Sequence, residues 1–271
     1  MVVTAAATQT RDFAWLRAHM PEDARCAMVD ITSGRPMLGL MGPRSRALLE
    51  AVSGEDLSNA AFPFGSSREI EIGYARVRAS RITYVGELGW ELYVPAEFAQ
   101  HVFETLVASG AAHGLRLAGY HAMNACRTEK GYRHWGHDIG VEDTPLEAGL
   151  GFAVAWEKKG GFVGRDALLR QRDQGAPKRR LVQLRLEDDG RLLYHEEPVW
   201  RDGAIVGAVT SGMYGHRLGA SLGMGYINHP DGVSREFVES GRFEIEVAWE
   251  RVGAQAQLAP FYDPRSERVK A

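Results

Sequence analysis

The segment richest in residues suited to ligand chemistry runs from Arg81 to Leu92 and reads RITYVGELGWEL. It places an aromatic side chain, Tyr84, and a carboxylate, Glu91, on either side of a glycine-bounded turn. This arrangement can direct both side chains toward one cavity. Such a cavity would suit a flat, polar heterocycle, because an aromatic ring can stack on it and a carboxylate can pair with its ring N–H and amino donors.

Two further segments hold more polar and aromatic side chains than a core requires. Residues 127–138, RTEKGYRHWGHD, predict the end of a helix followed by a loop crowded with donors and aromatic rings, and residues 145–152 read PLEAGLGF. From the residues alone, two interpretations are open. One is a solvated hairpin with an ion-paired loop, and the other is a pocket for a planar ligand.

A serine motif at residues 219–223, GASLG, matches the G-x-S-x-G nucleophile elbow of α/β-hydrolases. That elbow requires a strand before the serine and a helix after it. Here the residues that follow, MGYI, predict a strand, and the chain lacks an alternating βα pattern. We therefore interpret the match as chance.

His134, His137 and Asp138 have the spacing of a metal site on one helical turn. Gly131 and Gly136 predict a loop instead, and no further His/Cys pair is suitably spaced to complete a tetrahedral shell. We expect a hydrogen-bonded loop and no metal. The sequence also lacks the glycine fingerprints of dinucleotide and nucleoside triphosphate sites, so we expect no FAD site in this chain.

The elements that position these residues change character near residue 170. Before it, hydrophobic periodicity predicts an α+β domain with both helices and strands. The polar segment 171–180 predicts a linker, and short strands with turns follow, including an Asp202-Gly203 hairpin signal. The predicted helices are 11–19, 44–52, 96–109, 120–130 and a short one starting at 144; the predicted strands are 26–30, 37–41, 70–72, 75–83, 90–94, 180–186, 199–200, 204–210, 221–227 and 243–249.

Composition restricts the function further. The 271 residues are 45% hydrophobic and 25% charged, with a net charge of −3, so a generic basic surface for nucleic acid or an anionic membrane is excluded. Two cysteines are too few for a disulfide scaffold. No apolar run approaches the roughly 20 residues of a membrane helix, and no secretory signal is visible. We expect a cytoplasmic protein with partners that are neither nucleic acid nor membrane.

Taken in order, these segments resemble the aminomethyltransferase (glycine cleavage T-protein) superfamily, and most of all the C-terminal folate half of dimethylglycine and sarcosine dehydrogenases. The resemblance is carried by residues 82–95 (ITYVGELGWELYVP), 127–139 (RTEKGYRHWGHDI), 144–154 (TPLEAGLGFAV), 209–216 (VTSGMYGH) and 259–264 (APFYDP). It implies a folate-binding α+β domain over residues 1–170, followed by a small antiparallel β-barrel domain over residues 171–271.

The resemblance also implies tetrahydrofolate as the cofactor and assigns three folate-binding residues. Glu91 would anchor the pterin, Tyr84 would be a pocket aromatic, and Phe64, within FPFG, lies where relatives carry another. Further residues of the motifs are assigned pocket or supporting roles: Arg127, Tyr132, Trp135 and Tyr262. We expect Arg127 and Glu129 to tie the helix to the loop rather than to contact the ligand.

Two departures from the family pattern bear on activity. Glycine cleavage T-proteins carry an arginine one turn before the Arg127 position, where it meets the folate tail, and this chain has Met123. The proposed catalytic aspartate of the family lies in a hairpin before the segment matching Val2–Thr4, so we assign no catalytic residue here. The strand-like start suggests a missing N-terminal portion, and the flavin domain of the dehydrogenases is also outside this sequence.

Three functions remain open. The first is the folate-dependent part of a demethylating dehydrogenase, which captures a methylene unit from an N-methyl amine together with a flavin subunit. The second is a stand-alone aminomethyltransferase that acts with a lipoyl carrier protein. The third is a non-catalytic folate-binding module.

Overall fold

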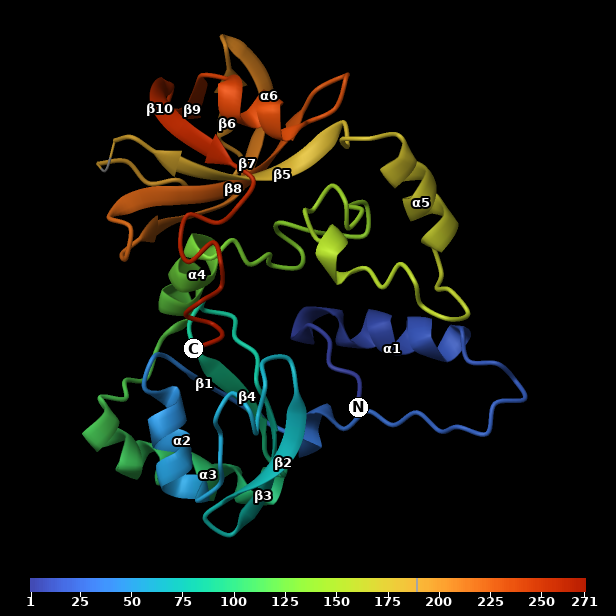
Figure 1. Cartoon of the computed structure of the whole chain (residues 1–271), viewed down its shortest axis with the longest axis vertical. Coiled ribbons are helices and arrows are strands. Elements are labelled where there is room, and N and C mark those ends of the chain that lie inside the picture. Colours follow the sequence, from blue (N-terminus) through green and yellow to red (C-terminus); the bar gives the residue numbers. More distant parts are fainter. Residues whose placement is uncertain (189) are drawn as a thin grey trace. The chain divides into compact units, whose positions relative to one another are not determined.

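The computed structural model describes residues 1–188 and 190–271 (Figure 1). Contacts between residues divide the chain into two compact units. The first comprises residues 1–82 and 89–115, and the second comprises residues 83–88 and 116–271. The boundary that we expected near residue 170 stays a prediction.

The first unit is built on a four-stranded antiparallel sheet with the order β1-β4-β3-β2. Helix α2 packs against α3 and contacts β2 and β4 (Figure 1). The elements of this unit are η1 (Ala6–Thr8), α1 (Gln9–Ala18), η2 (Thr32–Gly34), β1 (Met37–Met41), α2 (Ser45–Ser53), β2 (Ser67–Ile72), β3 (Ala75–Ser80), β4 (Gly89–Tyr93), η3 (Ala96–Phe98), α3 (Ala99–Gly110) and η4 (Ala111–His113).

Alternation of side chains along the strands gives this sheet a core face and a more open face, although Tyr93 on the open face is itself buried. On β4, Trp90 and Leu92 are fully buried, whereas Glu91 between them is only partly buried. The same alternation on β3 buries Val77 and Ala79. The buried face, together with α2, forms the core of this unit.

The second unit contains a closed barrel with the strand order β10-β5-β8-β7-β6-β9 (Figure 1). Its aliphatic interior includes Leu184, Val209, Ile227 and Ile245, all completely buried. The elements of this unit are α4 (Tyr120–Glu129), η5 (Gly151–Ala153), α5 (Arg165–Asp173), β5 (Arg179–Leu186), β6 (Pro198–Arg201), β7 (Ala204–Gly215), β8 (Ala220–Asn228), α6 (Arg235–Ser240), β9 (Phe243–Val247) and β10 (Glu250–Gln257).

Several sequence-based expectations are confirmed. The hairpin at Gly73 forms between β2 and β3, and Asp202-Gly203 joins β6 to β7 with both residues at positive φ. The G-x-S-x-G serine, Ser221, lies on β8 with strand after it, and its buried hydroxyl accepts a hydrogen bond from the Leu193 amide. It is therefore part of the barrel and not an elbow.

Others are wrong. Residues 26–30 form no strand, and α5 extends into the segment predicted as a linker. Around residue 144 a single turn replaces the expected helix. Thr144 and Glu147 still cap each other there, since the Glu147 amide donates to the Thr144 hydroxyl and the Glu147 carboxylate accepts from the Thr144 amide.

Among the described residues, no helix combines the length and the apolarity needed to cross a bilayer.

Candidate functional site

Glu91 projects from the open face of the sheet in the first unit. Its direct neighbours across the ladder are Gly39 on β1 and Ser80 on β3. Residues directly opposite in antiparallel strands share a face, so the carboxylate has a glycine on one side and a serine on the other. A Cβ built on Gly39 would meet only the end of the Met41 side chain, at 3.5 Å. On the β1 side, therefore, the residue directly opposite Glu91 carries no side chain of its own, and the end of Met41 lies near it.

The next residue on the same face of β4 is Tyr93, whose hydroxyl donates a hydrogen bond to Glu91 Oε2. Tyr93 is only 7% exposed. Burial and the adjacent Glu91 carboxylate both raise the pKa of this phenol, so it stays a donor. Among the described residues, Glu91 Oε1 has no hydrogen-bond partner. The site thus presents a carboxylate with one oxygen held by the protein and the other available.

Small hydroxyl groups continue this face beyond Glu91. Ser80 Oγ donates to Ser67 Oγ at 3.0 Å, across the β3–β2 pair. Farther along the face, charges pair with each other, with Arg76 Nε 2.6 Å from Glu69 Oε2. The charged side chains farther along the sheet therefore pair with each other. The Glu91 carboxylate takes no part in these ion pairs and can accept a hydrogen bond from a ligand.

Phe64, the predicted second pocket aromatic, lies in the first unit in the loop before β2. Its side chain is 42% exposed, whereas Phe62 of the same FPFG sequence is fully buried and packs against Trp90. Gly65 adopts a positive φ of 82° and its amide donates to the Arg81 carbonyl, which fixes the loop to the end of β3. Phe64 is thus a large ring held at the surface by its neighbours.

Tyr84, the predicted pocket aromatic, lies in the second unit. Its ring is nearly parallel to that of Tyr132, with an interplanar angle of 11° and centroids 6.1 Å apart. Its hydroxyl donates to the Arg133 carbonyl at 3.0 Å. Burial raises the pKa of both tyrosines, so both phenols are neutral at physiological pH. Glu91 and Tyr84 belong to different units.

Arg127 lies at the centre of a buried polar network in the second unit. Its guanidinium donates to Asp138 Oδ2 at 2.5 Å and to Ser211 Oγ at 2.9 Å. Asp138 also accepts from the Thr210 hydroxyl and the His134 amide. The network ties α4 and the following loop to β7. The loop is therefore hydrogen-bonded, and the described residues contain no cluster of three metal-ligating side chains.

A second network in the same unit attaches residues 83–88 and the C-terminal segment. Arg217 pairs with Glu87 at 3.0 Å and with the buried Glu129 at 2.8 Å, and its guanidinium lies over the Tyr262 ring. The Tyr262 hydroxyl donates to Glu87. Tyr262 therefore helps to fix the loop that begins with Tyr84.

The remaining predicted residues have simpler surroundings. Trp135 is partly buried and forms an isolated bridge with Ile139. Met123 is partly buried on α4, one turn before Arg127. Sequence reasoning missed Tyr93, Gly39, Glu87 and Arg217. Period-two spacing on the predicted strand could have identified Tyr93 as the neighbour of Glu91.

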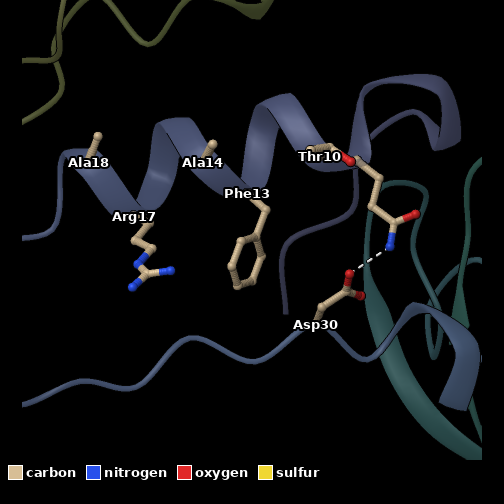
Figure 2. Close-up of a pocket in the computed structure, with 7 residues that line it drawn as sticks. Thr10, Phe13, Ala14, Arg17, Ala18 and Asp30 are labelled. Atoms are coloured by element: carbon tan, nitrogen blue, oxygen red, sulfur yellow. Dashed lines mark hydrogen bonds between the residues drawn. The ribbon is translucent and has the colours of Figure 1, made fainter.

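A hollow of about 610 Å³ lies along α1 in the first unit (Figure 2). Phe13 and Arg17 point toward the extended segment that carries Asp30. Gln9 Nε2 already donates to Asp30 Oδ2 at 2.6 Å. Arg17 also lines the hollow, which would therefore favour an anionic rather than a donor-bearing ligand.

Two family models match this chain. The GCVT N-terminal domain matches residues 1–158, and the glycine cleavage T-protein C-terminal barrel domain matches residues 179–263. The chain belongs to the glycine cleavage T-protein family. The closed barrel from Arg179 to Gln257 is the structural counterpart of the second match.

Similar proteins include 4-methylaminobutanoate oxidase (formaldehyde-forming) of Paenarthrobacter nicotinovorans, 41% identical over 100% of this chain and 32% of that protein. Human mitochondrial sarcosine dehydrogenase is 41% identical over 92% of the chain and 27% of that protein. The crystal structure of the glycine cleavage system aminomethyltransferase T from Bartonella henselae superposes with a TM-score of 0.80 at 26% identity, covering 96% of this chain and 67% of the other. The chain thus spans about a third or less of the length of the two oxidising relatives.

Proposed function

We propose that this T-protein-type chain binds a reduced folate through Glu91 and accepts a one-carbon unit released by demethylation of an N-methyl amine. The observation that carries the proposal is the carboxylate of Glu91, with Oε2 held by Tyr93 and Oε1 available beside Gly39. A reduced pterin presents adjacent ring N–H and amino donors, which pair with a carboxylate. The residues present therefore fit this group.

The other predicted residues would supply aromatic surface. Tyr84 and Phe64 offer rings suited to the pterin and the aminobenzoyl part of a folate. Because the pKa of Tyr84 is raised by burial, its phenol is uncharged at physiological pH. When bound, the folate would supply the two nitrogens that take up the methylene carbon. The chain would position the folate and exclude water.

The substrate class is supported by the relatives. The names of the two oxidising relatives refer to 4-methylaminobutanoate and sarcosine, which are both N-methyl amines. Since this chain matches less than a third of each of them, we assign amine oxidation to the remaining part of such proteins. A flavin dehydrogenase portion or subunit is accordingly the proposed partner.

Titration calorimetry with 5-formyltetrahydrofolate, a stable reduced folate, tests the binding role. We expect the Glu91→Gln variant to bind at least several-fold more weakly, because a charge-assisted pair becomes a neutral one. Glu50→Gln, on α2 at the other face of the sheet, is the matched control and should bind as the parent does. Equal affinities for Glu91→Gln and the parent would overturn the assignment.

A second candidate is a stand-alone aminomethyltransferase that acts with a lipoyl carrier protein. The structural similarity to the Bartonella henselae aminomethyltransferase favours this candidate. Met123 is evidence against it, because glycine cleavage T-proteins carry an arginine at this position. Methylenetetrahydrofolate formation above the rate without this chain should be measured with tetrahydrofolate and one of two carbon donors. One is an N-methyl amine with a flavin dehydrogenase and its electron acceptor, and the other is an aminomethyl-loaded lipoyl carrier. Product only with the carrier would favour this second candidate, and product with neither would favour a folate-binding module.

A further inference from the structure

We infer that Tyr93 is a positioning residue: it holds the Glu91 carboxylate in one orientation, with Oε1 directed to the ligand. The inference rests on the proposed function of Glu91 and extends it to a residue with no role assigned so far. It concerns the first unit alone, where both side chains project from β4.

The geometry of β4 brings Tyr93 next to the Glu91 carboxylate. Residues i and i+2 of a strand lie on the same face, and Tyr93 follows Glu91 in this way on β4. Its hydroxyl reaches Oε2. A free glutamate side chain has several accessible rotamers, and fixing one before the ligand arrives lowers the entropy that binding must overcome. Tyr93 thus preorganises the carboxylate.

The residues that surround Glu91 and Tyr93 on this face of the sheet offer no second donor to the carboxylate among those that the structure describes. Met37 on β1 and Arg78 on β3 lie directly opposite Tyr93. Arg78 donates to Glu69 Oε1, although at a long 3.5 Å. Within the described residues, Tyr93 is therefore the one side chain that donates a hydrogen bond to Glu91.

The hydrogen bond also selects the kind of group that Glu91 can bind. With Oε2 already accepting from Tyr93, Oε1 is the oxygen left for the ligand. An ionised carboxylate can only accept. The pair therefore favours ligands that present N–H donors and rejects those that present an acceptor at the same place. The preference for a donor-bearing pterin edge would then depend on Tyr93 as well as on Glu91.

The ligand-free protein provides the first test. Carbon-13 relaxation of labelled glutamate side chains at pH 7, assigned through Glu91→Gln, reports the mobility of the Glu91 side chain. We expect Tyr93→Phe to increase this mobility, because the hydroxyl that holds Oε2 is removed. Tyr74→Phe, at the exposed hairpin turn, is the control and should leave the mobility of Glu91 unchanged.

Binding provides the second test. With 5-formyltetrahydrofolate, Tyr93→Phe should weaken binding about 3- to 10-fold in the parent and less than about 2-fold in Glu91→Gln. An equal loss in both backgrounds would show a general packing role and overturn the inference, and so would an unchanged mobility of Glu91 in Tyr93→Phe. If Glu91→Gln itself leaves folate affinity unchanged, the proposed function fails, while the mobility of Glu91 in the ligand-free protein still reports on Tyr93.

Should Tyr93→Phe fold poorly, Met37→Leu alters packing against the same ring without removing the hydroxyl. This variant should keep the parental mobility of the Glu91 side chain. An increase in mobility as large as that measured in the soluble fraction of Tyr93→Phe would contradict the inference.

Discussion

Arg127 Nη1 lies 2.5 Å from Asp138 Oδ2, and both side chains are almost completely buried. Asp138 receives hydrogen bonds from the Thr210 hydroxyl and the His134 amide as well. A buried ion pair of this kind owes its stability to complete hydrogen bonding, because both charges have lost their water.

Breaking this pair from one side should therefore be strongly destabilising. We expect Asp138→Asn to lower the free energy of unfolding by about 3 kcal/mol, because it leaves the Arg127 charge buried without a counter-charge. Urea denaturation measures this loss in the free energy of unfolding. The control is Asp173→Asn, in a pair with Arg172 that is largely exposed, where we expect less than about 0.5 kcal/mol. A loss below about 1 kcal/mol in Asp138→Asn would show that water reaches the pair.

The C-terminal segment is attached by a second buried pair, whose effect should depend on pH. Lys130 Nζ lies 3.2 Å from Asp263 Oδ2 and 3.1 Å from Ser266 Oγ. Burial raises the pKa of Asp263, but hydrogen bonds from Lys130 and the Glu267 amide outweigh it, so that the pKa is lowered below 3.8. Its contribution to stability is present above the unfolded pKa and is lost as the pH falls through the folded one.

Asp263→Asn should therefore be less stable than the parent by about 2 kcal/mol at pH 7. The difference should shrink as the pH falls below about 4, where the unfolded carboxyl takes up its proton. Urea denaturation at several pH values measures it, with Glu239→Gln in the exposed pair with Arg235 as the control. A difference that stays constant down to pH 3 would contradict the role of the charge.

Much of the sheet in the first unit could be predicted from the sequence. Strand β3 alternates small or apolar with charged residues, and Gly73 marks the turn before it. Residues 26–30 are as apolar as a strand but form none, since a strand needs a partner ladder and periodicity does not reveal whether one exists.

The barrel was predicted less completely, because one of its turns lacks the usual residues. Strands β9 and β10 are joined at Ala248 and Trp249, which have positive φ values of 51° and 69°. Such turns normally carry Asn and Gly, so no turn was expected there and β10 was missed. Helix α5 was not predicted. The charged residues at its end resemble a linker in composition, and they were assigned to one.

The surroundings of the candidate residues show the same limit of sequence patterns. The assignment of Glu91 and Tyr84 to a folate site stays a prediction, drawn from one continuous motif. The pairing of Arg217 with Glu87 could not, since it joins positions far apart in sequence. Side-chain networks of this kind depend on tertiary packing, which local pattern does not encode.

The unusual turn offers a stabilising variant. Changing Ala248 to Asn and Trp249 to Gly should raise the free energy of unfolding by about 1 kcal/mol, because both residues then tolerate positive φ. Trp249 is 93% exposed, so little packing is lost. Trp249→Ala is the matched control, since it removes the ring but keeps the strain. Equal free energies of unfolding for the Ala248→Asn/Trp249→Gly double variant and for Trp249→Ala, measured by urea denaturation, would show that the turn stores no strain.

Met123 provides a gain-of-function prediction for the folate tail. The T-proteins carry an arginine at this position that meets the tail, so Met123→Arg should strengthen binding of 5-formyltetrahydrofolate about 5-fold through a charge-assisted bond to a tail carboxylate. The ligand 6-methyltetrahydropterin has no tail, and its affinity should not change. Met123→Leu is the control for the altered helix surface. Calorimetry distinguishes the outcomes: an equal gain for both ligands would place the new arginine elsewhere, and no gain for either would contradict the alignment of Met123 with the tail-binding position.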